Sequence, residues 1–123
     1  MNENHILVIE DNDFVRMQLC KFLQDEGFET TEARDGQEAL DTDFKKVAII
    51  IADVRMEPMN GFDFVRNIRS NEIKIPVILV TGDENSDLLS EASKLNIGAI
   101  LKKPVQKDRL IKTVKRTLHM ENP

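Results

Sequence analysis

With 123 residues the chain has the length of one folded domain, so we expect residues 1–123 to form a single domain. Its composition of 41% hydrophobic and 32% charged residues is typical of a soluble globular protein and excludes a disordered or low-complexity chain. The net charge of −5, with lysines and arginines scattered along the chain, argues against direct binding to nucleic acid.

The chain begins with an apolar, mostly β-branched run at residues 6–9, which is typical of a strand buried on both faces of a sheet. A helix is predicted next, because apolar residues recur at helical spacing as far as Gly27, which ends it. Residues 28–33 predict a weaker strand, whose Glu and Thr residues favour the edge of a sheet. A second buried strand follows at residues 47–52.

The second half of the chain continues this alternation. A helix, a buried strand at residues 77–80, another helix and a short strand at residues 99–101 follow in turn. The last helix, near residues 106–118, has one apolar stripe and a basic face that we expect to be solvated. The five alternations predict an α/β fold of three layers, with an open, parallel, five-stranded, flavodoxin-like sheet in the order 2-1-3-4-5.

Two features of the sequence indicate the cellular compartment of the protein. The single cysteine, Cys20, cannot form an intramolecular disulfide, and Met1 precedes polar residues rather than an apolar signal segment. The longest apolar runs, such as residues 47–52, are far shorter than the roughly 20 residues that a membrane-spanning helix needs. We therefore expect a cytoplasmic protein without a membrane span.

Polar residues follow the buried strands at the points where these strands end. Glu10 and Asp11 follow the first strand, Asp53 the third, Thr81 the fourth and Lys103 the fifth. Because the carboxyl ends of parallel strands share one edge, where open α/β folds bind their ligands, these side chains are expected to converge. Clustered carboxylates repel one another without a cation, and their hard oxygen atoms suit Mg²⁺.

Such a site would let Asp53 act as a carboxylate nucleophile and form an aspartyl phosphate, while Lys103 and Thr81 contact the phosphoryl oxygens. Each residue alone also has a plainer interpretation. Asp11 could merely cap the first helix, and Lys103 could be a solvent-exposed loop lysine. The coincidence of these residue types at four strand ends favours a functional site.

The order and spacing of these residues resemble the signature of the receiver domains of response regulators, the chemotaxis regulators included. The motifs that carry the resemblance are Glu10-Asp11, Asp53 followed by Met56 and Gly61, Thr81-Gly82, and Lys103-Pro104. The resemblance implies that Asp53 accepts a phosphoryl group from the histidine of a sensor kinase or phosphotransfer protein, in a Mg²⁺-dependent reaction. It also implies that Asp11, Asp53 and the backbone carbonyl of Arg55 ligate the metal, with Glu10 helping through water.

The resemblance further implies a switch. Thr81 would turn toward the bound phosphoryl group and Lys103 would pair with it, changing a readout surface on the fourth helix, fifth strand and fifth helix. The partner would be a downstream effector protein or a fused output domain, and the protein itself a monomer or weak dimer. It would take part in its own phosphorylation and dephosphorylation without being a classical enzyme, with Arg55 and Asp83 influencing the rate of hydrolysis.

Two positions depart from the family pattern. The chain has Met56-Glu57-Pro58 after the acceptor, so the usual proline is displaced by one residue and Glu57 adds a negative charge. This predicts a different path for the loop. Ile100 stands where many members have a Tyr or Phe that changes rotamer, so we expect the aromatic half of the switch to be absent or altered.

Two other functions compete with this interpretation. One is an interaction module of the same fold that signals without phosphorylation, which would not need the full set of five polar residues. The other is a phosphatase with an aspartate nucleophile, which would require a general acid and a substrate pocket that the sequence does not supply. His5, His119 and Cys20 are assigned no function.

Overall fold

The computed structural model describes residues 4–82 and 86–118 and forms a parallel five-stranded sheet in the order β2-β1-β3-β4-β5. The strands are β1 (His5–Ile9), β2 (Glu29–Ala33), β3 (Ile49–Asp53), β4 (Val77–Thr81) and β5 (Ala99–Lys102). The predicted fold and strand order are confirmed. Among the described residues, no helix is both long and apolar enough to cross a membrane.

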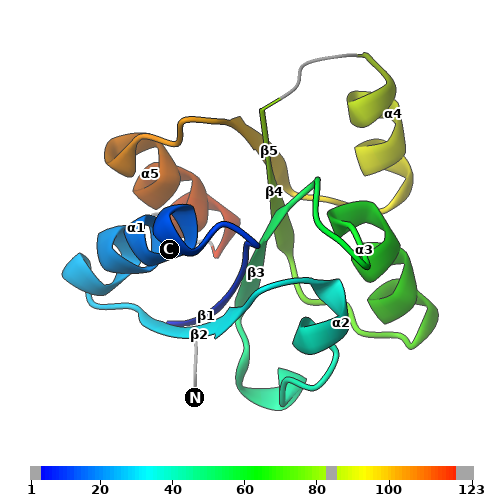
Figure 1. Cartoon of the computed structure of the whole chain (residues 1–123), viewed down its shortest axis with the longest axis horizontal. Coiled ribbons are helices and arrows are strands. Elements are labelled where there is room, and N and C mark those ends of the chain that lie inside the picture. Colours follow the sequence, from blue (N-terminus) through cyan, green and yellow to red (C-terminus); the bar gives the residue numbers. More distant parts are fainter. Residues whose placement is uncertain (1–3, 83–85, 119–123) are drawn as a thin grey trace.

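Helices cover both faces of the sheet and produce the three predicted layers (Figure 1). They are α1 (Asp13–Asp25), α2 (Gly36–Ala39), α3 (Gly61–Ser70), α4 (Ser86–Lys94) and α5 (Lys107–Thr117), with a 3-10 turn at Phe44–Lys46. The helices α1 and α5 lie on one face, and α2, α3 and α4 lie on the other (Figure 1). Each face has its own hydrophobic cluster.

The central strands are apolar without interruption because both of their faces are buried. In β1, Ile6 and Val8 belong to the cluster under α1 and α5, whereas Leu7 and Ile9 belong to the cluster under α2, α3 and α4. The edge strand β2 is largely solvent-accessible apart from Ala33, as its polar sequence predicts.

The strands β3, β4 and β5 each extend one residue further toward the carboxyl edge of the sheet than the sequence predicts. Asp53 is the last residue of β3 and pairs with Val80, and Thr81 is the last residue of β4 and pairs with Lys102. The third strand also begins later than predicted, because the 3-10 turn precedes it and Val47 caps that turn. Asp53 and Thr81 are therefore held by the sheet itself, whereas Glu10, Asp11 and Lys103 lie just after the ends of β1 and β5.

Local signals set the start and the end of α1. Asn12, not Asp11, is the N-cap, and its side-chain oxygen accepts a hydrogen bond of 3.0 Å from the Val15 N–H. The helix ends before Gly27, which has a φ of 92° and thus the left-handed conformation that favours glycine. The plainer interpretation of Asp11 as a helix cap is wrong, and its carboxylate remains available to the site.

Candidate phosphoacceptor and metal site

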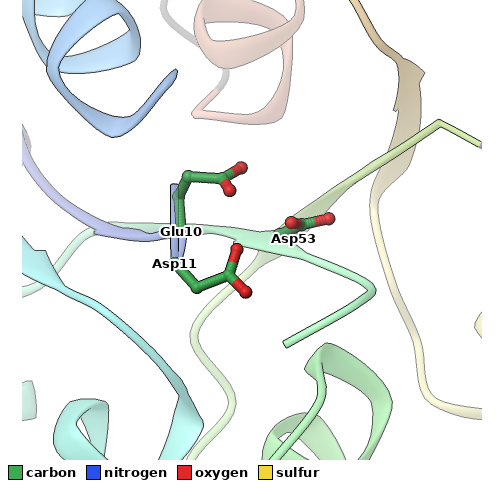
Figure 2. Close-up of side chains that lie close together, drawn as sticks. All are labelled: Glu10, Asp11 and Asp53. Carbon is green, nitrogen blue, oxygen red and sulfur yellow. The ribbon is translucent and has the colours of Figure 1, made fainter. Parts of the chain in front are cut away.

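Three carboxylates meet at the carboxyl edge of the sheet. Glu10 and Asp11 reach the site from the end of β1 and Asp53 from the end of β3 (Figure 2). One oxygen from each carboxylate can be chosen so that all three lie within 4.8 Å of one another. Glu10 and Asp53 are buried, whereas Asp11 is exposed, so the cluster opens to solvent on the side of Asp11.

Glu10 is the most deeply buried of the three, with 1% of its surface exposed. Its Oε2 accepts a hydrogen bond of 3.1 Å from the Asn12 N–H. Its burial raises the pKa of the carboxyl from 4.5 to about 7; the Asn12 N–H and the Lys103 ammonium oppose this rise, and the charge of Asp53 adds to it. The Glu10 carboxyl is therefore hard to ionise unless more positive charge is supplied.

Lys103 links two of the carboxylates. Its ammonium donates a hydrogen bond of 3.0 Å to Asp53 Oδ2 and lies 3.0 Å from Glu10 Oε1. The contact with Glu10 is an ion pair without hydrogen-bond geometry, since Glu10 Oε1 is the buried side-chain oxygen that accepts no hydrogen bond among the described residues. Burial lowers the pKa of Lys103, but the hydrogen bond to Asp53 and the negative charges of both carboxylates outweigh this and raise it.

The plainer interpretation of Lys103 as a solvent-exposed loop lysine is therefore wrong, because only 28% of its side chain is exposed and it faces two carboxylates. Thr81 is 2% exposed and lies at the same edge, one residue beyond the Val80 partner of Asp53. The backbone N–H of Arg55 donates a hydrogen bond of 3.3 Å to Asp53 Oδ1. The structure thus brings the predicted site residues to one edge of the sheet.

The loop between β3 and α3 packs tightly against the end of β3. The Gly61 N–H donates a hydrogen bond of 3.0 Å to the Val54 carbonyl, and a Cβ atom at Gly61 would lie 2.5 Å from the Asp53 carbonyl oxygen. Only glycine permits this approach. Two residues before Gly61, the Met59 carbonyl accepts a hydrogen bond of 3.3 Å from the Gly36 N–H, which joins the loop to α2.

This loop, with its displaced proline, encloses open space beside Asp53. The peptide bonds before Pro58 and Pro104 are both cis. A cavity of about 640 Å³ is lined by loop residues from Val54 to Glu57, by Asn60 and by Asp11. The exposed Asp11 carboxylate and the backbone after Asp53 therefore share one opening.

Arg16 supports the turn that carries the acidic pair, and the sequence did not indicate this role. It donates hydrogen bonds of 2.8 Å to the Glu10 carbonyl, 2.9 Å to Glu32 and 2.7 Å to Asp13. Only 12% of its side chain is exposed, although it belongs to a helix whose charged residues are otherwise expected to face solvent. It joins α1, β1 and β2 next to the site.

The remaining residues singled out in the sequence do not join the site. His5 is buried and its Nε2 lies 2.6 Å from Thr31 Oγ1, which indicates a structural role. Cys20 is buried in the cluster under α1 and α5, and burial raises its pKa to about 11. Ile100 is partly buried and packs against the cluster under α4. Asp83 and His119 lie outside the described residues.

The donor set fits a hard divalent cation. Three carboxylates form the cluster and Lys103 pairs with two of them; two of the three are buried, and the pKa of Glu10 is raised. A cation among them would remove the repulsion between Glu10 and Asp53 and would favour the ionised form of Glu10. The acidic cluster is therefore a candidate metal site.

Comparison with known proteins agrees with this geometry. The model of the response regulator receiver domain family matches residues 6–115. The transcriptional regulatory protein PdtaR of Mycobacterium tuberculosis is 34% identical over 111 residues, covering 89% of this chain and 54% of that protein. The regulatory protein AtoC of Escherichia coli is 32% identical over 121 residues, covering 97% of this chain and 26% of that protein. The chain thus spans about half or less of these relatives.

Solved structures match over nearly their whole length. The chemotaxis protein CheY4 of Vibrio cholerae is 31% identical with a TM-score of 0.86, covering 92% of this chain and 97% of that chain. A response regulator receiver protein of Pseudomonas putida is 30% identical with a TM-score of 0.84, covering 91% of this chain and 95% of that chain. The chain therefore belongs to the response regulator receiver domain family, the signalling modules of two-component systems.

Proposed function

We propose that Asp53 accepts a phosphoryl group from the phosphohistidine of a sensor kinase or phosphotransfer protein, and that Mg²⁺ is required. The observation that carries this proposal is the position of the Asp53 carboxylate. It is bound to Lys103 at 3.0 Å, lies in one cluster with Glu10 and Asp11, and sits at the end of a buried strand beside a cavity. A carboxylate so placed has the charge partners that phosphoryl transfer needs.

The proposed metal ligands follow from the same cluster. Asp11 and Asp53 would hold Mg²⁺ through their carboxylates, Arg55 through its backbone carbonyl, and Glu10 through a water molecule. When bound, the ion supplies the charge neutralisation that lets an anionic carboxylate approach an anionic phosphoryl group. The raised pKa of Glu10 supports this assignment, because the site without a cation carries more negative charge than Lys103 can balance.

The transfer itself uses the Asp53 carboxylate as nucleophile. One carboxylate oxygen forms a bond to phosphorus as the bond from phosphorus to the donor imidazole breaks, and the imidazole leaves with the electron pair. Lys103, which already contacts Asp53 Oδ2, would exchange this contact for a phosphoryl oxygen. The buried Thr81 would contribute its hydroxyl from the end of β4. The chain then acts as a phosphorylated signalling module rather than as an enzyme that releases a product.

The signal would leave the site through the strands that carry Thr81 and Lys103. Thr81 ends β4 before the segment that leads to α4, and Lys103 directly follows β5. Their movement toward the phosphoryl group would therefore alter the surface formed by α4, β5 and α5, which an effector protein or a fused output domain would recognise. The continuous sheet with a helical layer on each face supports the further proposal that residues 1–123 form one receiver domain.

Intact mass measurement after incubation with acetyl phosphate tests the proposal. We expect the wild type to gain one phosphoryl group when Mg²⁺ is present and none when EDTA replaces it, and Asp53→Asn to gain none. Asp41→Asn is the matched control, since Asp41 is exposed, lies in the turn after α2 and is not a member of the carboxylate cluster, and it should behave as the wild type does. An equal mass gain in Asp53→Asn, or a gain that does not depend on Mg²⁺, would sink the proposal.

A further inference from the structure

The loop between β3 and α3, residues 54–60, has two methionine anchors and an exposed side. Met56 is 5% exposed and belongs to the hydrophobic cluster under α2, α3 and α4, and Met59 is partly buried and packs against the same cluster. Arg55 and Glu57 are exposed, and both line the cavity beside Asp53. The two methionines therefore hold the loop against the protein, while Arg55 and Glu57 border the open space.

Met59 meets Gly36, the first residue of α2, with both its backbone and its side chain. The Gly36 N–H donates a hydrogen bond of 3.3 Å to the Met59 carbonyl. A Cβ atom at Gly36 would lie 2.8 Å from Met59 Cγ and 3.0 Å from the Met59 carbonyl oxygen, so a larger residue would push the loop away. Glycine at the start of α2 thus lets the loop dock on this helix.

The start of α2 is a fixed support for this contact. Its N-cap Asp35 accepts a hydrogen bond of 2.9 Å from the Glu38 N–H, and the Glu38 carboxylate accepts one of 2.9 Å from the Arg34 N–H. These hydrogen bonds tie the helix start to the residue that follows β2, and Gly36 itself is buried. The position of Gly36, and with it the docking place of Met59, is therefore set by β2 and α2 rather than by the loop.

The docking of the loop matters because the proposed metal ligands differ in their freedom to move. The carboxylate ligands can rotate about their side-chain bonds, whereas the Arg55 carbonyl moves only with the backbone of the loop. Arg55 and Met59 belong to the same short loop, so a shift of Met59 away from α2 would displace the Arg55 carbonyl as well. Since Mg²⁺ demands near-ideal octahedral geometry, a small displacement of one ligand weakens its binding.

We propose that Gly36 and Met59 are positioning residues for the metal, because their contact holds the loop where the Arg55 carbonyl can complete the coordination of Mg²⁺. Neither residue touches the ion. This inference deepens the proposed function and rests on its metal ligands, but it does not require that Asp53 accepts a phosphoryl group. It gives α2, which contributes no ligand, a part in the affinity for the ion.

Urea unfolding of the full chain at rising Mg²⁺ concentration and constant ionic strength separates this role from a merely structural one. The free energy of unfolding in EDTA reports the packing, and its gain with Mg²⁺ reports the affinity of the folded protein for the ion. We expect Met59→Ala to bind Mg²⁺ about tenfold more weakly, which lowers the gain by about 1.4 kcal/mol at concentrations above both dissociation constants. Met59→Leu, which nearly preserves the side-chain volume, should keep the wild-type affinity within about twofold.

Ile73→Ala is the matched control, because Ile73 is also partly buried against the same cluster but lies between α3 and β4, at the opposite edge of the sheet. It should lower the free energy of unfolding in EDTA and leave the gain with Mg²⁺ unchanged. Gly36→Ala disturbs the contact from the side of α2 and should also weaken Mg²⁺ binding about tenfold. Combined with Met59→Ala it should add little, since both variants disrupt one contact.

The possible outcomes distinguish this inference from the proposed metal site. An equal gain with Mg²⁺ in Met59→Ala and the wild type would overturn the inference and leave the metal site in place. A loss of affinity in Ile73→Ala as large as that in Met59→Ala would also overturn it, because general loosening of the core would then explain the effect. If the wild type gained no stability from Mg²⁺, the metal site would be wrong and the inference with it.

Discussion

Replacement of Glu10 by Gln should make the metal-free protein more stable at neutral pH. Burial raises the pKa of the Glu10 carboxyl from 4.5 to about 7. One pKa unit corresponds to about 1.4 kcal/mol, so this rise of roughly 2.5 units costs the folded state about 3 kcal/mol once Glu10 is ionised. The cost is absent below pH 4.5, where the carboxyl is protonated in both states, and nearly complete above pH 7.

The glutamine variant keeps the length of the side chain and an oxygen for the Asn12 N–H, but it cannot ionise. Urea unfolding in EDTA, at pH values from about 5 to about 8, measures its free energy of unfolding against that of the wild type. Over this pH range the difference should grow in favour of Glu10→Gln by about 2.5 kcal/mol, whatever constant offset the lost ion pair with Lys103 adds. For Glu57→Gln, at an exposed position beside the same site, the free energy of unfolding should change with pH in parallel with that of the wild type.

Saturating Mg²⁺ should reverse this difference, because the ion binds the ionised cluster of the wild type and stabilises it by mass action. Parallel pH profiles for wild type and Glu10→Gln in EDTA would refute the argument, since they would mean that burial does not hold back the ionisation of Glu10. If the free energy of unfolding of the wild type rose with pH while that of Glu10→Gln stayed constant, the predicted sign of the effect would be wrong.

Three further variants are expected to have measurable effects. Lys103→Met should lower the free energy of unfolding by about 1 to 3 kcal/mol in EDTA, because it leaves two carboxylates without their ammonium, and Mg²⁺ should offset part of the loss in urea titrations. Gly61→Ala should cost about 1 to 3 kcal/mol and slow the proposed phosphorylation by acetyl phosphate, since its Cβ would meet the Asp53 carbonyl oxygen at 2.5 Å. Gly98→Ala, whose Cβ would meet atoms no closer than 3.5 Å, is the control, and an equal cost would contradict the steric argument. Arg16→Gln should weaken Mg²⁺ binding measured by calorimetry, because the turn after β1 loses its anchor; unchanged affinity would show that the turn holds without it.

The sequence predicted the sheet well because its signals are local and repeated. Each buried strand is a short apolar run, and both of its faces meet helices, so no alternation was needed to recognise it. In a parallel sheet the carboxyl ends of all strands lie at one edge. Asp53 and Lys103 could therefore be placed at the same edge from the sequence, although 50 residues separate them.

The parts that the sequence did not predict depend on contacts between distant segments. Arg16 resembles any charged helical residue, and its role becomes visible only when Glu32 and the Glu10 carbonyl lie beside it. The choice of Asn12 over Asp11 as helix cap depends on one residue of register, which spacing does not resolve. The sequence identifies Gly61 as part of a motif. Glycine is needed there because the α3 backbone approaches Asp53 closely, and this approach is visible only in the structure.

The double contact of Lys103 has a consequence for how sensitive the proposed switch would be. Since this ammonium already contacts Asp53 and Glu10 in the structure, phosphorylation would exchange one set of anionic partners for another rather than create pairs from solvated ions. An exchange of like contacts leaves a small free-energy difference between the two states. A bound partner of modest affinity could then shift the populations appreciably, so that the effector, as well as the phosphoryl group, would set how much of the protein is in the signalling state.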